Sequence, residues 1–277
     1  MALDGWSNVH NEPVICVIVT NQNGNCYLID TIDTEDNAHT AEYLLNVTKS
    51  VIQKTESRFD CHITSLVTDC AANMSKMRKE IEADHDFFIT YGCTAHALNL
   101  LAKDLEIPGV KDHVVHVMKY FRNHHLPASW YKLAGGKKLM LPQDVRWNTL
   151  SDCLESFLRN WPILVQVCEE HRDRIDKDIA RQVTNLSLKR NVEDYLQLLK
   201  PISVALDKVQ SNTCVISEAV EVWLCLHSTL KENQSQSVLD KVEKRMRTTL
   251  TPYHFLAHIL DPRYFGESQS NPQITVA

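Results

Sequence analysis

The sequence predicts an α/β unit in its first third, followed by a region built from helices. Two observations carry this prediction. Short β-branched segments alternate with segments of helical apolar spacing up to about residue 91. Beyond about residue 110, apolar residues recur at helical intervals and no further strand is predicted. The predicted organisation is therefore a small α/β unit joined to a helical region.

The first predicted strands form a hairpin. Segments 13–20 (PVICVIVT) and 26–32 (CYLIDTI) are rich in β-branched residues, and the turn sequence 21–25 (NQNGN) separates them. Two more short apolar segments, 63–68 and 87–91, are also predicted strands. Apolar spacing predicts helices at 41–52, after Asp69 through Ile81, and at 95–105, 110–121, 147–161, 192–209, 216–230 and 238–250.

Composition places the chain among ordinary globular proteins. It has 277 residues, of which 44% are hydrophobic and 23% are charged. No apolar run approaches the roughly 20 residues that span a bilayer, and the N-terminus lacks a signal pattern, so we expect an intracellular protein without a membrane partner. The nine cysteines are scattered and form no CxxC pair, which predicts reduced thiols.

Charge is unevenly distributed along the chain. The formal net charge is −6, which does not indicate nucleic-acid binding. The segment from Lys111 to Trp147, however, contains seven Lys and Arg residues and four histidines, but only two acidic residues, Asp112 and Asp144. This segment favours either a nucleic-acid contact or an ordinary solvated surface, and charge alone does not separate the two.

Two aspartates are candidate metal ligands. Asp69 follows an apolar strand and precedes a helix, so its carboxylate could hold a divalent cation or cap that helix. Asp4 follows Leu3 and could lie on a central strand beside Asp69, or could be a turn residue before Gly5. A pair of carboxylates is typical of Mg²⁺-dependent phosphoryl transfer, which normally requires a third acidic ligand.

Two further pairs carry possible functional chemistry. Cys93 and His96 open a predicted helix, where they could lock the strand–helix turn but are too few for a closed zinc site. Arg146 and Trp147 follow a basic loop that contains Lys137 and Lys138. An indole can stack on an unpaired base and Arg can hold phosphate, although Trp147 could equally begin the apolar stripe of a helix.

Five short motifs occur in order along the chain. They are LDGWS at 3–7, VTDCAANM at 67–74, GCTAHALNLL at 92–101, DVRWNT at 144–149 and LDPRY at 260–264. Together they resemble the catalytic core of the hAT superfamily of DNA transposases. The resemblance implies an RNase H-like core, a mixed sheet with flanking helices, over residues 1–125. It further implies an all-α insertion domain over 126–265 and a polar tail over 266–277, with the C-terminal part of the core missing.

The resemblance also assigns roles to residues. Asp4 and Asp69 match the first two catalytic aspartates and would bind Mg²⁺, and Cys93 and His96 match the CxxH structural motif of the family. Arg146 and Trp147 match the motif whose Trp is associated with a flipped base in DNA, and Lys137 and Lys138 lie in the preceding basic loop.

The departures from the family pattern determine what we expect of this chain. The catalytic Glu of the family, in a Ser-Glu-Arg-like stretch, has no counterpart here, nor has its N-terminal BED-type zinc finger. We therefore expect a nuclear, DNA-binding and catalytically inactive protein in which Mg²⁺ binding is weak or absent. Without the dimerisation region of the family, homo-oligomers are not expected, and a cytoplasmic location is the alternative to the nucleus.

Three alternatives remain open at this stage. The chain could be a fragment of an active hAT transposase that cleaves and transfers DNA strands with Mg²⁺. It could be a host module for protein interaction or transcriptional regulation. It could also be an unrelated metal-dependent nuclease that uses Asp30 and Asp33, although these lie in an acidic turn typical of a solvated surface.

Overall fold

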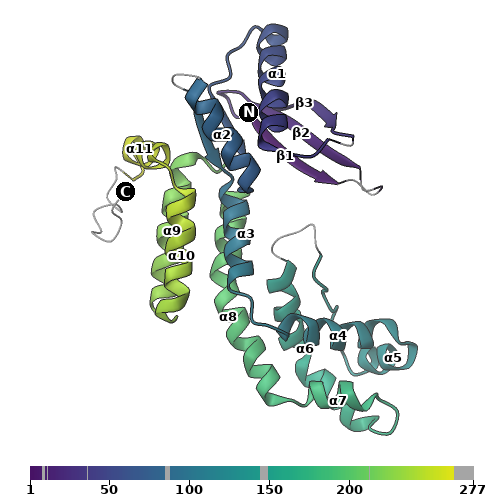
Figure 1. Ribbon diagram of the computed structural model, residues 1–277. Coiled ribbons are helices and arrows are strands. Elements are labelled where there is room, and N and C mark those ends of the chain that lie inside the picture. Colours follow the sequence, from purple (N-terminus) through teal and green to yellow (C-terminus); the bar gives the residue numbers. More distant parts are fainter. Residues whose placement is uncertain are drawn as a thin grey trace. The chain divides into compact units, whose positions relative to one another are not determined.

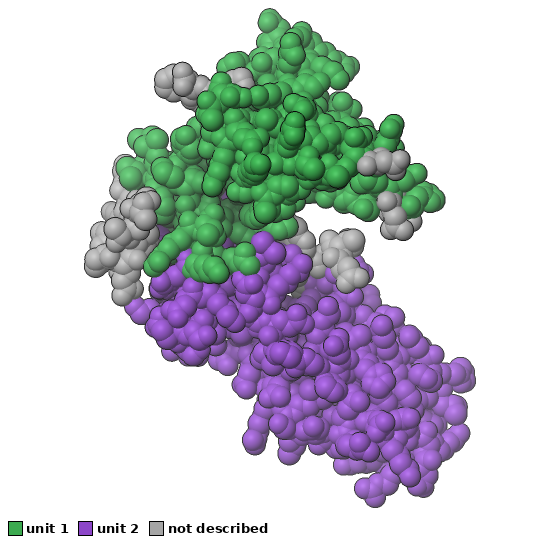
Figure 2. Space-filling model, in the orientation of Figure 1, with its two compact units in different colours: residues 1–97, 215–221, 244–277 green, residues 98–214, 222–243 purple. Residues whose placement is uncertain are grey.

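The computed structural model describes residues 1–7, 10, 12–35, 37–84, 88–143, 149–211 and 213–264. The chain divides into two compact units, which are treated separately below (Figure 2). Unit 1 comprises Met1–Ala97, Val215–Glu221 and Lys244–Ala277, and unit 2 comprises Leu98–Cys214 and Val222–Glu243.

The described part of unit 1 contains one mixed sheet of five strands (Figure 1). The strands are β1 (Ala2–Ser7), β2 (Pro13–Thr20), β3 (Cys26–Asp33), β4 (Ser65–Thr68) and β5 (Ile89–Gly92). Their order is β3-β2-β1-β4-β5, so β1 is central. It pairs antiparallel with β2 and parallel with β4, and β4 pairs parallel with β5. The predicted mixed sheet with flanking helices, followed by a helical region, is confirmed.

The predicted hairpin between β2 and β3 is confirmed, and its turn has a clear local cause. The side chain of Asn21 accepts hydrogen bonds from the backbone N–H groups of Asn23 and Asn25, both at 3.0 Å. Gly24 has φ 81°, a left-handed conformation that glycine adopts without steric cost. The asparagine-rich turn therefore closes the hairpin with its own side chains.

One face of the sheet is buried against two helices, α1 (Ala41–Phe59) and α2 (Ala72–Asp84). Leu3, Ile15 and Val17 point into this core, where the helices contribute residues such as Leu44 and Met77. Because side chains alternate along a strand, the residues between these point to the opposite face. On β1 and β2 that face stays largely open, since Asp4, Trp6 and Ile18 are exposed.

The rest of the described chain is helical. Its helices are α3 (Thr94–Asp104), α4 (Val110–Asn123), α5 (His125–Leu133), α6 (Thr149–Glu170), α7 (Lys177–Val183), α8 (Leu186–Val209), α9 (Ile216–Lys231), α10 (Gln236–Thr249) and α11 (Pro252–Leu260). The predicted helical stripes all lie within these helices apart from residues near their ends. The sequence analysis missed α5, α7 and α11, because each has nine residues or fewer and so offers little periodicity.

Unit 2 has its own apolar core among α4, α6 and α8. Phe121, Phe157 and Tyr195 are its largest fully buried aromatic side chains from these helices. The contact-based division of the chain falls after Ala97, whereas the sequence analysis placed a domain boundary at 125. The predicted boundaries at 125 and 265 concern domains of a family and stay predictions. No helix in the described residues combines the length and apolarity needed to cross a membrane.

The LDPRY motif forms a polar cluster that ties the end of α11 to the start of α9 within unit 1. Asp261 accepts hydrogen bonds from the Ser217 hydroxyl at 2.7 Å and from Arg263 Nη2 at 2.8 Å. Arg263 Nη1 in turn reaches Glu218 Oε1 at 2.5 Å. These donors hold the pKa of Asp261 well below its usual range, chiefly through Arg263 and then Ser217. In this structure the motif is therefore a structural connection.

His254 closes the first turn of α11 as a neutral ring. Its Nδ1 accepts a hydrogen bond from the backbone N–H of Thr251 at 3.1 Å, which requires this nitrogen to be unprotonated. The residue is 1% exposed. Burial lowers the pKa of His254 from 6.5 to about 4, because the charged ring loses its hydration.

The stability of the protein should therefore fall in mildly acidic solution. Between pH 6.5 and about 4 the unfolded chain protonates His254 while the folded chain does not, so the free energy of unfolding decreases as the pH falls through this window. The full effect is on the order of 3 kcal/mol. Urea unfolding at pH 7.5 and 4.5 measures it. The variant His254→Asn keeps an acceptor for Thr251 but cannot titrate, so an equal loss of stability in both proteins would contradict this origin.

Candidate functional site

Two aspartates and two cysteines, from four neighbouring strands, form a row across one face of the sheet. Ala2 is level with Val67 on β4, and Val67 is level with Tyr91 on β5. Two residues further along these parallel strands, the same register places Asp4, Asp69 and Cys93 side by side. Asp4 also pairs with Cys16 on β2. Neighbouring strands lie about 4.8 Å apart, so the predicted placement of Asp4 on a central strand beside Asp69 is confirmed.

Asp69 turns the chain from β4 into α2. Its Oδ1 accepts a hydrogen bond from the Ala71 N–H at 2.8 Å, which forms an Asx turn just before α2 and not the predicted cap of that helix. The backbone just before Asp69 is held as well, because the Cys93 N–H donates a hydrogen bond to the Thr68 carbonyl at 2.7 Å. No hydrogen bond to Asp69 Oδ2 occurs among the described residues, and this oxygen remains available to a ligand. The Asx turn and ligand binding by Asp69 are therefore compatible here.

Asp4 carries the electrostatic signature of two adjacent carboxylates. The protein around it shields the carboxylate partly from water, and this desolvation raises its pKa above 3.8. The negative charge of Asp69 raises the pKa of Asp4 further, while the Gly5 N–H and His96 oppose the shift. Two like charges held together in this way repel each other, and a bound cation would relieve that repulsion.

Cys93 and His96 stand at the start of α3, as the sequence predicts. Burial raises the pKa of the Cys93 thiol, and the backbone N–H groups of His96 and Ala95, which point at its sulfur, oppose the rise. The Cys93 carbonyl accepts the first helical hydrogen bond, from Ala97 N–H at 3.0 Å. Cys93 thus shapes the strand–helix turn, and a protonated thiol is no ligand for a hard cation such as Mg²⁺.

Arg78 on α2 is a residue of this site that the sequence analysis missed. Its Nη1 donates to the Thr68 hydroxyl and, at 2.7 Å, to the Asp69 carbonyl. Gly92 lies beside this side chain: a Cβ there would meet Arg78 Nη2 at an ordinary 3.5 Å but would crowd Cys70 Sγ at 3.1 Å. Arg78 therefore clamps the backbone that presents the Asp69 carboxylate. Its local sequence, a polar helical segment, carries no signal of this role.

The pair Asp4 and Asp69 fits a weakly held Mg²⁺. Mg²⁺ is commonly bound by one or two carboxylates while keeping several waters or taking phosphate oxygens. Within the described residues, no group of three His, Cys, Asp or Glu side chains is arranged to hold a metal. Asp30 and Asp33, the other candidate acids, lie on β3, which β2 separates from β1. They do not complete the pair.

Trp6 is a second residue that the sequence analysis did not single out. It lies two residues after Asp4 on β1 and so projects to the same face of the sheet. Its side chain is 49% exposed, which is unusual for so large an apolar group. An exposed indole next to paired carboxylates offers an aromatic surface to a bound molecule.

The basic loop between α5 and α6 belongs to unit 2. The Lys137 N–H donates to Asn160 Oδ1 at 2.8 Å, and the Ser156 hydroxyl donates to the Lys138 carbonyl at 3.1 Å. The loop backbone is thereby fixed along α6, while the side chains of Lys137 and Lys138 are exposed. The other predicted DNA-binding residues, Arg146 and Trp147, lie outside the described residues.

Removing the charge of Asp69 should lower the pKa of Asp4. We expect Asp69→Asn to shift it downward without restoring its ordinary value, because partial desolvation, the larger cause, remains. The pKa can be followed by NMR titration with ¹³C-labelled aspartate side chains. Asp30→Asn is the matched control, since this exposed carboxylate lies two strands away. An unchanged Asp4 in Asp69→Asn would show that the two carboxylates do not interact.

Comparison with known proteins gives one family match. Residues 1–119 match DUF659, a domain of unknown function. The matched segment includes the whole sheet with Asp4, Asp69, Cys93 and His96, and it ends within α4. A search of curated proteins finds no match to the chain. The α/β part of this protein is thus similar to a domain family whose function is not established.

Proposed function

We propose that this chain is a transposase-derived, nucleic-acid-binding protein that holds Mg²⁺ weakly through Asp4 and Asp69 and does not cleave DNA by itself. The observation that carries the proposal is the register of β1 and β4, which brings Asp4 level with Asp69 on an open sheet face. The order of the five sequence motifs supports the ancestry. So does the match to DUF659, a domain found in proteins related to hAT transposases.

The chemistry of the site supports metal-assisted binding in preference to catalysis. A bound Mg²⁺ would supply charge neutralisation for phosphate oxygens at this edge of the sheet. Asp4 and Asp69 would hold it from two adjacent strands, and Trp6 would offer its exposed face to a nucleobase. Strand cleavage needs a third acidic ligand, and the described residues bring none to this pair. We therefore propose binding without turnover.

The basic loop of unit 2 supports nucleic acid as the partner. Lys137 and Lys138 are exposed on a backbone that is fixed to α6, so little conformational entropy of the main chain opposes their contact with phosphates. This function would place the protein in the nucleus. The alternative function is that the chain is part of an active transposase. It differs from the proposed function in predicting Mg²⁺-dependent cleavage of DNA.

Neutralising the basic loop should weaken DNA binding in a salt-dependent way. For Lys137→Gln/Lys138→Gln we expect lower affinity for a labelled duplex and a slope of log K against log salt that is shallower by about 0.9 per lost phosphate contact. Fluorescence anisotropy over a range of NaCl concentrations measures both. Lys79→Gln/Lys177→Gln removes two other exposed lysines and should leave the slope unchanged. Equal affinity of wild type and the loop variant would exclude this loop as the contact.

The carboxylate pair should bind Mg²⁺ but not nick DNA. We expect millimolar Mg²⁺ to perturb the Asp4 side-chain NMR signal in the wild type and not in Asp69→Asn, with weaker binding at low pH because protons compete for Asp4. Asp30→Asn should behave as wild type. Supercoiled plasmid and a hairpin-forming DNA end should stay intact with Mg²⁺. Cleavage that is lost in Asp69→Asn would overturn the claim of inactivity and favour the active transposase.

A further inference from the structure

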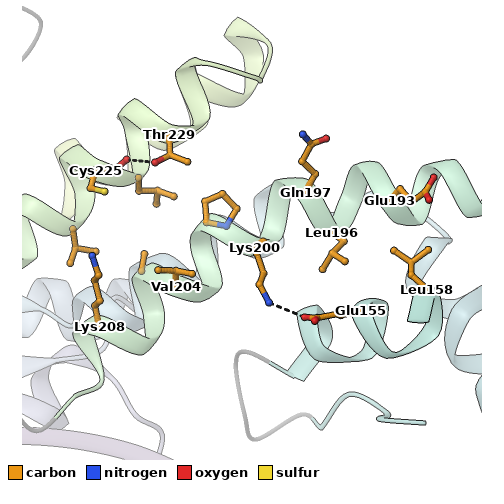
Figure 3. Close-up of a pocket in the computed structure, with 14 residues that line it drawn as sticks. Glu155, Leu158, Glu193, Leu196, Gln197, Lys200, Val204, Lys208, Cys225 and Thr229 are labelled. Atoms are coloured by element: carbon orange, nitrogen blue, oxygen red, sulfur yellow. Dashed lines mark hydrogen bonds and ion pairs between the residues drawn. The ribbon is translucent and has the colours of Figure 1, made fainter. Parts of the chain in front are cut away.

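A long apolar groove runs along unit 2. It has a volume of about 710 Å³ and is lined by α8 and α9, with two residues of α6 (Figure 3). Leu196 and Val204 of α8 form part of its floor, and Cys225 of α9 lies at its side. Val204 is 48% exposed, so the groove leaves substantial apolar surface in contact with water. Such surfaces in water-exposed grooves are typical of interaction sites.

The spacing of the lining residues matches the surface of a helix. On α8 they follow one another at intervals of three and four residues from Glu193 to Lys208, and on α9 the same spacing runs from Val222 to Thr229. At 1.5 Å per residue, the stripe on α8 is about 22 Å long. α8 lines the groove along this whole length, α9 flanks it near Val204 and Lys208, and α6 flanks it at the other end (Figure 3). Apolar side chains at helical spacing on α8 can pack against a helix of about four turns. A compact small molecule would leave most of this length uncovered.

The charges at the rim of the groove indicate which sign of charge a partner should carry. Glu155 is bound by Lys200 at 2.8 Å, as Figure 3 shows, and by Arg159 at 3.1 Å. Glu193 is paired with Lys189. Lys208, by contrast, has no ion pair among the described residues. The acidic groups of the groove are thus already neutralised, and the remaining charge is a lysine at one end.

We propose that the α8–α9 groove binds an amphipathic helix of a partner protein, with an apolar stripe along the furrow and a carboxylate opposite Lys208. This inference is independent of DNA binding, since it concerns neither the basic loop nor the carboxylate pair. It commits to helix-in-groove recognition, in which apolar side chains at helical spacing supply the affinity. The charge pair sets the direction in which the helix lies.

A second copy of this chain is a poorer occupant. Its helix α11 has an exposed apolar face that includes Leu256 and Leu260. That helix spans only Pro252–Leu260 and carries no acidic residue within it. Asp261, which follows it, is already held by Arg263 and Ser217. Charge complementarity and length therefore both favour a different, acidic helix.

The test uses the full chain and synthetic helical peptides of about 15 residues. Three peptides each carry leucines at three- and four-residue spacing. The first has two glutamates at its N-terminal end, the second has them at its C-terminal end, and the third has two lysines in their place. Anisotropy of a fluorescent label measures affinity, and reaction of Cys225, an exposed thiol, with a maleimide reports occupancy of the groove. We expect one glutamate peptide to bind more tightly than the lysine peptide by about three- to tenfold, and to protect Cys225.

Variants separate the groove from nonspecific adhesion. Lys208→Glu should reverse the preference between the glutamate and lysine peptides. Val204→Asp should weaken every peptide more than tenfold, because a carboxylate would be buried in the furrow. Leu133→Asp, at an 83% exposed leucine on α5 outside the groove, should change neither. Circular dichroism checks that each variant is folded.

The inference fails if the peptides bind without protecting Cys225, or if Lys208→Glu leaves their preference unchanged. It also fails if the free protein forms a dimer in sedimentation experiments and Val204→Asp dissociates it, because the groove would then hold a second copy. DNA binding by the loop residues is measured separately, so neither result depends on the other.

Discussion

The parallel pairing of β1 with β4 is the constraint on which the candidate site depends. It sets Asp4 level with Asp69, while the antiparallel partner β2 places Cys16 on the other side. A shift of one residue in this register would turn Asp4 toward the apolar core and Leu3 toward water. The buried Leu3, Ile15 and Val17 therefore fix the position of the carboxylates, although they take no part in any chemistry.

Holding two carboxylates side by side costs free energy, and the surrounding structure limits that cost. The Gly5 N–H and His96 oppose the repulsion that Asp4 experiences from Asp69. Arg78 binds the backbone carbonyl of Asp69 and not its carboxylate. The arrangement concentrates negative charge at the place that the proposed Mg²⁺ would occupy. The same open face carries Trp6, so charge and aromatic surface are presented together.

The site residues were predicted from sequence with uneven success, for identifiable reasons. Asp69 and Cys93 follow strands that short β-branched or aromatic runs reveal, so their place in the fold could be predicted. The strand Ala2–Ser7 contains no β-branched residue, so its sequence left Asp4 open between a strand and a turn. Arg78 could not be predicted, because its role depends on α2 folding back over the end of β4. The α8–α9 groove was also invisible, since apolar residues at helical spacing look the same whether a neighbouring helix covers them or not.

The sequence by itself determined the fold class, the hairpin, most helices and the order of the motifs, because these follow from local periodicity and turn chemistry. Tertiary structure decided which of the motif residues meet. It made LDPRY a structural cluster, brought two acids together on one face, and left a furrow between α8 and α9 uncovered. Strand register and helix packing bring together residues that are far apart in the chain, and such contacts cannot be predicted from local sequence patterns.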